Sequence, residues 1–226
     1  MLAVSISLLT ALVSTADART DHRHIWRCRP HHPNLVAANK RAEIFEVGET
    51  EEGVLHPEHF DGCAYGSTHP YSLGLAHVIG SSSGVGGSDG YTLAGATAAY
   101  TEDFLDGPGE VEERWSVRVV DLRTGRMIHN VPSGTAPCQS ASSWWIFGVG
   151  PVVALVLRED GAVAWIASDQ EQACPLPAGT REVHALDSHG ERVLSVGADI
   201  DPRSLTLVGS SIHWRQGGQA HAAPLD

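Results

Sequence analysis

The chain has 226 residues, 42% of them hydrophobic, which is enough for a packed core and excludes global disorder. Its 27 acidic and 15 basic residues give a formal net charge of −12 at neutral pH, with histidine counted as neutral. Such an acidic chain, without a basic stripe, is not expected to bind nucleic acid or an anionic lipid surface.

Residues 1–18 have the pattern of a secretory signal peptide. Leu2 to Val13 is apolar apart from Ser and Thr, and Ala16-Asp17-Ala18 supplies the small residues that a signal peptidase recognises. No Lys or Arg precedes Arg19, so the usual positively charged start is missing. The apolar run is shorter than the roughly 20 residues that span a bilayer, and no later stretch comes close. We therefore expect a secreted, extracellular protein with no membrane span, whose single domain covers residues 19–226.

Residues 19–90 are expected to be the less regular part of this domain, held in place by a disulfide. Residues 19–34 (RTDHRHIWRCRPHHPN) are rich in Arg, His and Pro, which is typical of an irregular arm. The first predicted strand is Ala42 to Val47. Residues 48–60 are predicted to form an acidic loop, and residues 80–90 (GSSSGVGGSDG) a flexible linker.

Residues 91–226 are more regular, with short strands separated by glycine-bearing turns and an acidic loop at 103–113. No stretch offers the ten or so residues of helical apolar spacing that a globular helix needs. The predicted strands are 91–93, 96–101, 115–122, 127–131, 152–157, 162–167, 182–186, 192–196, 204–208, 211–215 and 219–223. The sequence therefore predicts an antiparallel, all-β domain.

A weak internal repeat runs through this part of the chain. Ala99-Tyr100 aligns with Ala164-Trp165, and Gly125 aligns with Gly190 at the same offset of 65 residues. Ile212-His213-Trp214 begins a third, truncated copy. Repeated units of four antiparallel strands are typical of propeller blades. We predict a β-propeller-like fold with a small, open or incomplete ring of such units, and a β-sandwich is the alternative.

Four segments carry a resemblance to known proteins: Val119 to Gly125 (VVDLRTG), Val156 to Ile166 (VLREDGAVAWI), Ile200 to Leu205 (IDPRSL) and Leu207 to Trp214. Over about residues 90–226 the chain resembles a set of uncharacterised exported bacterial proteins with degenerate β-propeller-like repeats. The resemblance implies this architecture and export. It implies no reaction, because no activity or ligand is known for that group.

Four cysteines follow the signal segment: Cys28, Cys63, Cys138 and Cys174. An even number in an exported chain predicts two disulfides. Of the three pairings, we favour Cys28–Cys63 with Cys138–Cys174, because cysteines that are neighbours in sequence close shorter loops. A zinc site is disfavoured because the chain has no C-x-x-C pair.

The glycine-rich segment offers one candidate nucleophile. Gly80-Ser81-Ser82-Ser83-Gly84 matches G-x-S-x-G, with Ser82 on a strand-to-helix elbow. The residues that follow, Gly86-Gly87-Ser88-Asp89-Gly90, do not continue as a helix, so a flexible loop is favoured. The spacing also resembles the glycine pattern of short-chain dehydrogenases. Those enzymes need a downstream Tyr-x-x-x-Lys, and the only lysine, Lys40, lies upstream.

Histidines and carboxylates are numerous but form no recognisable ligand set. His22-x-His24 and His56-x-x-His59 have spacings that suit a metal ion, yet they lie in segments that look like loops. The acidic stretches 49–58 and 102–113 do not match a calcium-binding loop. We expect solvated side chains in both cases, and no metal or other cofactor.

Tryptophan is the remaining signal for binding. Trp165 and Trp214 lie in alternating strands and are predicted to be core residues. Trp144 and Trp145 are adjacent, and adjacent strand residues face opposite sides, so one of them can reach the surface near Cys138. Although core packing is favoured for tryptophan in general, this pair is the candidate ligand contact.

These features predict an exported, non-catalytic binding or interaction module with a protein or carbohydrate partner. The alternative is a secreted hydrolase, which would act either through Ser82 or through carboxylates or a metal ion in a propeller funnel.

Overall fold

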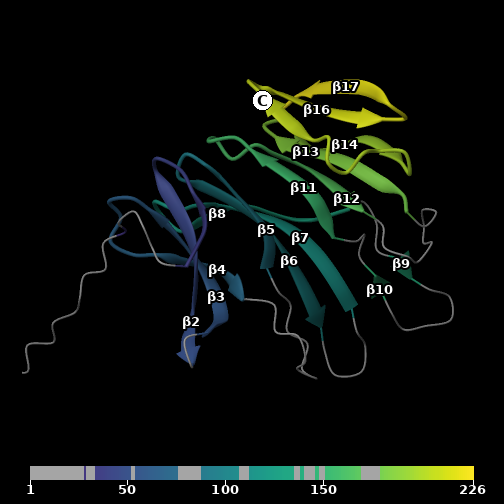
Figure 1. The fold of residues 1–226 in the computed structure, drawn as a ribbon. Coiled ribbons are helices and arrows are strands. Elements are labelled where there is room, and N and C mark those ends of the chain that lie inside the picture. The colour runs from purple at the N-terminus through teal and green to yellow at the C-terminus, as the bar shows by residue number, and fades with distance from the viewer. Residues whose placement is uncertain are drawn as a thin grey trace, which may run out of the picture.

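The computed structural model describes residues 28, 34–51, 54–75, 88–106, 112–134, 138–139, 146–147, 151–168 and 179–226. Within these ranges the chain forms strands and turns without a helix, arranged as four consecutive antiparallel sheets, none of them closed into a barrel (Figure 1). The predicted all-β fold class is confirmed. The described part of the chain holds no helix of the length and apolarity needed to cross a membrane.

Sheets A, C and D are meanders whose strands pair in chain order, and sheet B adds two short strands beside such a meander. Sheet A contains β1 (Leu35–Ala38), β2 (Ala42–Glu51), β3 (Val54–Ala64) and β4 (Tyr71–Leu75). Sheet B contains β5 (Ser88–Ala94), β6 (Thr97–Asp106), β7 (Glu112–Asp121) and β8 (Arg126–Pro132), together with the two-residue strands β9 (Cys138–Gln139) and β10 (Ile146–Phe147). Sheet C contains β11 (Val152–Leu157), β12 (Val163–Ser168), β13 (Arg181–Asp187) and β14 (Gly190–Gly197). Sheet D contains only β15 (Thr206–Val208), β16 (Ser211–Gln216) and β17 (Gln219–Pro224).

The internal repeat corresponds to these sheets. Ala99-Tyr100 lies in β6 and Ala164-Trp165 lies in β12, which are the second strands of sheets B and C. Gly125 and Gly190 both lie at the turn between the third and fourth strands, with φ angles of 69° and 87°. The predicted third copy is sheet D, in which Ile212 and Trp214 again belong to the second strand, β16.

The first third of the chain is more regular than the sequence suggested. Sheet A is a four-stranded unit with the same connectivity as sheets B and C. The acidic loop predicted over residues 48–60 is wrong, because β2 and β3 pair along their whole length, from Ala42↔Ala64 to Glu51↔Val54. Acidic residues disfavour strands in isolation, but pairing in a long hairpin overrides that weak preference.

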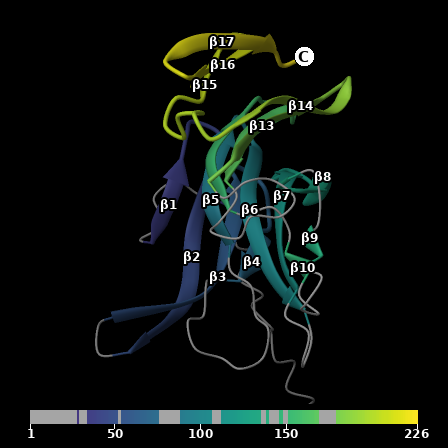
Figure 2. The same cartoon turned by 90° about the vertical axis from the view of Figure 1, so that its right-hand side faces the viewer.

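The hydrophobic core is divided between three interfaces of adjacent sheets. Ile44, Phe60, Leu73, Tyr100 and Leu122 pack between sheets A and B. Val117, Val119, Val163, Trp165 and Leu186 pack between sheets B and C. Ile166, Val183, Ile212, Trp214 and Leu225 pack between sheets C and D. Sheets B and C are therefore covered on both faces, and Figure 2 shows sheet D lying over sheet C. Trp165 and Trp214 are 0% and 5% exposed, which confirms them as core residues.

Cys28 and Cys63 lie at disulfide distance, with their Cα atoms 5.6 Å apart, and this confirms the predicted pairing. Both are buried beside Phe45, in a small cluster of sheet A that is separate from its interface with sheet B. Cys138 lies in β9, where it pairs with Phe147 of β10. Cys174 lies outside the described residues, so the Cys138–Cys174 disulfide stays a prediction.

The two ends of the stacked sheets differ. In a four-stranded meander, the connections between strands one and two and between strands three and four lie at the same end. In this chain those connections are short turns, and hydrogen bonds join turns of neighbouring sheets. The Asn39 side-chain amide donates to the Gly95 carbonyl (2.9 Å), and the Thr97 hydroxyl donates to the Glu159 carbonyl (2.9 Å). Arg41 forms an ion pair with Glu159 (3.0 Å). We call this the turn end.

The opposite end, here called the loop end, receives the three longest connections, 76–87, 133–151 and 169–180. Apart from the short strands β9 and β10, the strands that border five segments of the chain all end or begin there. These segments are 52–53, 76–87, 107–111, 135–150 and 169–178. This follows from the antiparallel register, since Asp106 pairs with Glu112, Ser116 with Pro132 and Ser168 with Arg181.

The C-terminus is fastened to the turn end through Asp187. The buried Asp187 carboxylate accepts hydrogen bonds from the backbone N–H groups of His189 (2.9 Å) and Asp226 (3.1 Å) and pairs with Arg192. The Ser188 N–H donates to the Asp226 carbonyl (3.0 Å). Burial by itself would raise the pKa of Asp187, but the two backbone donors and the Arg192 guanidinium outweigh it and hold the pKa below its ordinary value.

We expect this anchor to make stability depend on pH in the acid range. A carboxyl group whose pKa is lowered by folding stabilises the native state above its unfolded pKa of about 3.9, and that contribution is lost as the pH falls through the folded pKa. Asp187→Asn should cost about 1.5–3 kcal/mol at neutral pH, and the difference from the unmodified protein should shrink below about pH 4. Urea unfolding at a series of pH values measures both. A difference that does not change with pH would contradict this role.

Candidate functional site

The candidate functional residues Ser82, Trp144 and Trp145 lie outside the described residues. The strands next to their segments, however, end or begin at the loop end of the stack. Ser82 belongs to segment 76–87, between β4 and β5. Trp144 and Trp145 directly precede β10, in which Phe147 pairs with Glu113 of β7. The strands on either side of these segments end at the loop end. The candidate nucleophile and the candidate ligand-contact aromatics are therefore connected to the same end of the stack.

The described residues contribute a buried polar pair between sheets B and C, within the loop-end half of β13. Successive residues of β13 alternate between the two faces of sheet C. Val183 and Ala185 pack towards sheet D, whereas Glu182, His184 and Leu186 face sheet B. Because sheet B covers that face, Glu182 and His184 are 2% and 0% exposed. In a single sheet, the polar face of such an alternating strand would be solvated. Here that face is covered by sheet B, the preceding repeat unit.

The pair is bound by specific contacts to both sheets. His184 Nε2 lies 2.9 Å from Glu182 Oε2, and Nδ1 lies 3.5 Å from Glu191 Oε1 of β14. The His184 ring stacks on Trp165, with centroids 4.9 Å apart and planes inclined by 7°. Trp165 Nε1 in turn donates to the Ser133 carbonyl of sheet B (2.6 Å).

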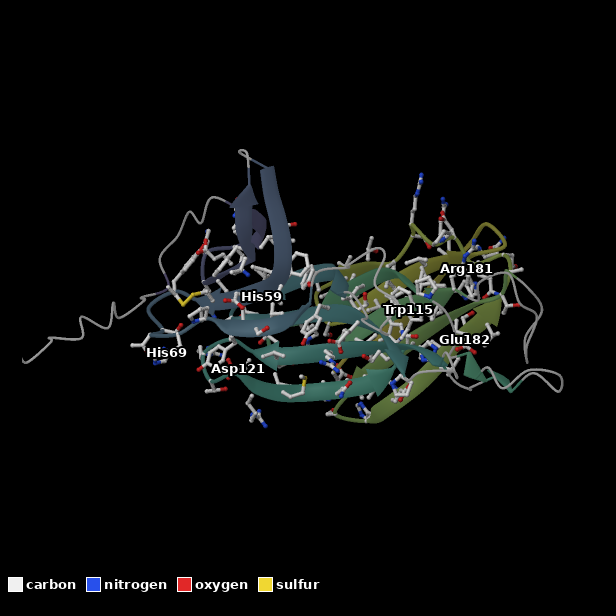
Figure 3. The ribbon with its side chains drawn as sticks, turned by 90° about the horizontal axis from the view of Figure 1, so that it is seen from below. His59, His69, Trp115, Asp121, Arg181 and Glu182 are labelled. Carbon is white, nitrogen blue, oxygen red and sulfur yellow. A yellow bond between two sulfur atoms is a disulfide. The ribbon has the colours of Figure 1, made fainter. Side chains whose placement is uncertain are left out.

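Ser133 extends these contacts to β7, a strand that begins at the loop end. Its N–H donates to the carbonyl of Trp115 (2.9 Å), a half-buried residue near the start of β7. Figure 3 shows Trp115 of β7 towards the same end of the molecule as Arg181 and Glu182 of β13, with Asp121 towards the other end. A continuous path of hydrogen bonds and ring stacking therefore joins β7, β8, β12 and β13 just behind the loop end.

The chemistry of this pair suits a structural role. A histidine that donates from Nε2 to a carboxylate keeps Nδ1 as an acceptor, which is the arrangement of a general base. The Nδ1 atom of His184 has no hydrogen-bond partner among the described residues and is itself buried, and the whole side chain is closed to solvent. A substrate has no access to it. The pair instead lies buried between sheets B and C, and His184 stacks on Trp165, which hydrogen-bonds to the Ser133 carbonyl after β8.

A second polar pair of the stack joins two neighbouring strands of sheet B. Arg118 of β7 forms an ion pair with Glu102 of β6. Burial raises the pKa of the neighbouring Tyr100 hydroxyl above its ordinary value, so Tyr100 stays neutral in the core. Among the described residues, no three His, Cys, Asp or Glu side chains are grouped so that they could hold a metal ion.

Sequence reasoning assigned residues 182–186 to a strand but did not single out Glu182 or His184. The signal that could have identified them is their i, i+2 spacing inside an internal repeat unit. An internal unit is covered on both faces, so a polar pair on either face must be buried and paired.

No family model matches this chain, and no curated protein or solved structure matches it either. What the chain itself provides is a rigid stack of sheets with its longer connections gathered at one end.

Proposed function

We propose that this protein is an exported, non-catalytic binding module whose contact surface is the loop end. One observation carries the proposal: the three longest connections, 76–87, 133–151 and 169–180, leave the sheets at that end, while hydrogen bonds join turns of neighbouring sheets at the opposite end. Loops presented by a rigid scaffold are the usual location of binding residues. The Cys28–Cys63 pair fits export, because disulfides persist in oxidising compartments.

The residues available to these connections suggest the class of ligand. Segment 140–145 contributes Trp144 and Trp145, and segment 107–111 is flanked by carboxylates on both sides. Large amphipathic rings provide contact area with little loss of side-chain entropy. Acidic surroundings and a net charge of −12 disfavour anionic ligands. An uncharged polysaccharide is the ligand that suits this composition, and a protein surface is the second choice.

The rival hydrolase has less support. Ser82 is connected to the loop end, but a nucleophilic serine needs an accessible histidine within hydrogen-bond reach. The buried Glu182–His184 pair is closed to solvent and cannot act as that base in this conformation. Generic ester turnover that is equal in the unmodified protein and in Ser82→Ala would remove the elbow hypothesis.

The binding proposal predicts that the purified chain sediments with insoluble uncharged polysaccharides such as chitin or β-glucan. Replacing both Trp144 and Trp145 by alanine should lower the retained fraction by at least about tenfold, because each buried aromatic contact is worth 1–3 kcal/mol or more. Trp214→Phe, in the core between sheets C and D, is the matched control, and it should bind normally while folded. If the double variant binds as well as the unmodified chain, the loop end is not the contact surface.

A further inference from the structure

His184 lies between two carboxylates, one near each nitrogen of its ring. Nε2 lies 2.9 Å from Glu182 Oε2 on β13, and Nδ1 lies 3.5 Å from Glu191 Oε1 on β14. The two carboxylates differ in their access to water, because the Glu182 side chain is 3% exposed and the Glu191 side chain is 36% exposed. The imidazole is therefore enclosed between the sheets, but through Glu191 it contacts a group that solvent reaches.

The protonation state of the ring decides what Nδ1 can do towards Glu191. A neutral imidazole that donates from Nε2 to Glu182 carries only a lone pair at Nδ1. Nδ1 then faces an oxygen that is also an acceptor, and it has no hydrogen-bond partner among the described residues although it is buried. A protonated imidazole carries an N–H on both nitrogens. Its Nδ1–H can be donated to Glu191, and the positive charge then lies between two carboxylates.

Within sheet C, the other groups close to the ring do not compete for the proton at Nδ1. On β12 the ring stacks on Trp165, whose indole does not titrate. On β14 the residue after Glu191 is Arg192, which is paired in register with Ala185 and so belongs to the face towards sheet D. Its guanidinium pairs with Asp187. The face that His184 shares with Glu191 therefore receives no positive charge from Arg192.

Sheet B presents an apolar surface and one histidine to this face. β7 contributes Val117 and Val119, which pack between sheets B and C. β8 contributes His129, which is paired in register with Val119 and so shares its face. Burial lowers the pKa of His129 below its ordinary value, so that it is uncharged at neutral pH. Acidic side chains that contact the His184 ring therefore come from sheet C itself.

We propose that His184 is a pH-sensitive clamp, which binds β14 through Glu191 in its protonated form and releases Glu191 when it loses the proton. In the protonated form the ring donates from Nε2 to Glu182 and from Nδ1 to Glu191. When the pH rises, the Nδ1 proton leaves to solvent on the side of Glu191, and two acceptors then face each other. The clamp lies between the sheets, so it operates whatever the loop end binds.

The effect of Glu191→Gln on the urea unfolding of the full chain tests the proposal at about pH 5.5 and about pH 8, on either side of the usual histidine range. Glutamine has the size of glutamate but no charge, and its amide can donate to a bare Nδ1. In acid the substitution should raise the unfolding equilibrium constant about two- to fivefold, the range of a partly exposed ion pair. At the higher pH it should not raise that constant, because a hydrogen bond replaces the contact between two acceptors. An equal effect at both pH values overturns the proposal.

Glu159→Gln is the matched control. Its carboxylate is exposed at the turn end and pairs with Arg41 (3.0 Å), and neither partner changes charge in this pH range. The control therefore measures the general effect of removing one negative charge from an acidic chain. Its effect on unfolding should differ little between the two pH values. A difference as large as that of Glu191→Gln overturns the proposal.

Proton NMR of the histidine rings gives a second readout, which a purely structural role of His184 would not change. Stacking on Trp165, with ring centroids 4.9 Å apart, should displace the His184 ring resonances from those of the other histidines. These resonances should titrate in the unmodified chain, and in Glu191→Gln they should titrate at lower pH, because an opposite charge nearby favours the protonated ring. In Glu159→Gln their midpoint should be unchanged. Displaced resonances that do not titrate, or a midpoint that is the same in both variants, overturn the proposal.

Discussion

Replacing Trp165 with alanine is expected to lower the free energy of unfolding by about 3–5 kcal/mol, the usual cost of truncating a buried aromatic residue. Trp165 is fully buried between sheets B and C and stacks on His184. Its Nε1 also supplies the hydrogen bond to the Ser133 carbonyl of sheet B. The substitution therefore opens a cavity and removes a direct link between the two sheets. Urea unfolding followed by far-ultraviolet circular dichroism measures the loss.

Trp165→Phe is the appropriate control. Phenylalanine retains most of the apolar area and the stacking on His184 but cannot donate to Ser133. Its cost should be clearly smaller than that of alanine, and it should remain folded even if the alanine variant does not. If Trp165→Ala lowered the free energy of unfolding by less than about 1 kcal/mol, the effect would be no larger than that of an average substitution. The interface between sheets B and C would then contribute little to stability.

The second large effect concerns the buried polar pair. His184→Leu removes the imidazole that lies 2.9 Å from Glu182, whose side chain is 3% exposed. Removing one member of a buried, hydrogen-bonded polar pair typically costs about 3–5 kcal/mol, because the remaining side chain stays buried without the contact to its partner. Equilibrium unfolding in urea should therefore show His184→Leu to be strongly destabilised, although leucine fills a similar volume.

The double variant Glu182→Leu/His184→Leu separates the loss of packing from the loss of pairing. With both polar groups replaced, no buried charge remains, and the double variant should be more stable than His184→Leu alone. With Glu182→Leu measured as well, the unmodified protein and the three variants form a double-mutant cycle. We expect this cycle to give a coupling energy of about 0.5–3 kcal/mol between the two positions. A double variant that is less stable than His184→Leu would contradict the pairing.

Prediction from sequence was most successful where the signal was local. The strands at residues 152–157, 182–186 and 211–215 correspond to β11, β13 and β16, because alternation of apolar residues and glycine-bearing turns are properties of a few consecutive residues. It failed at residues 48–60, where the acidic composition pointed to a loop. The described residues of that segment lie in β2 and β3, which pair with each other in one long hairpin. Such pairing cannot be recognised from composition.

The candidate site was only partly predictable for a related reason. Trp144, Trp145 and Ser82 were selected by residue type and motif, and nothing in the sequence showed that their segments leave the sheets at one end. That result depends on the directions of β4 to β10, which the antiparallel register sets. Glu182 and His184 were passed over because an alternating strand normally exposes its polar face, and whether the next sheet covers that face is a non-local property.

The sequence alone predicted most strands and turns of residues 91–226, the 65-residue offset between two units and the pairing of Cys28 with Cys63, since each depends on short-range pattern or on chain-closure entropy. Only the tertiary structure decided that sheets B and C are covered on both faces and that a Glu–His pair is enclosed between them. The physical reason is the same in each case. Alternation states that the two faces of a strand differ, but burial and edge pairing depend on which other sheet comes to lie against them.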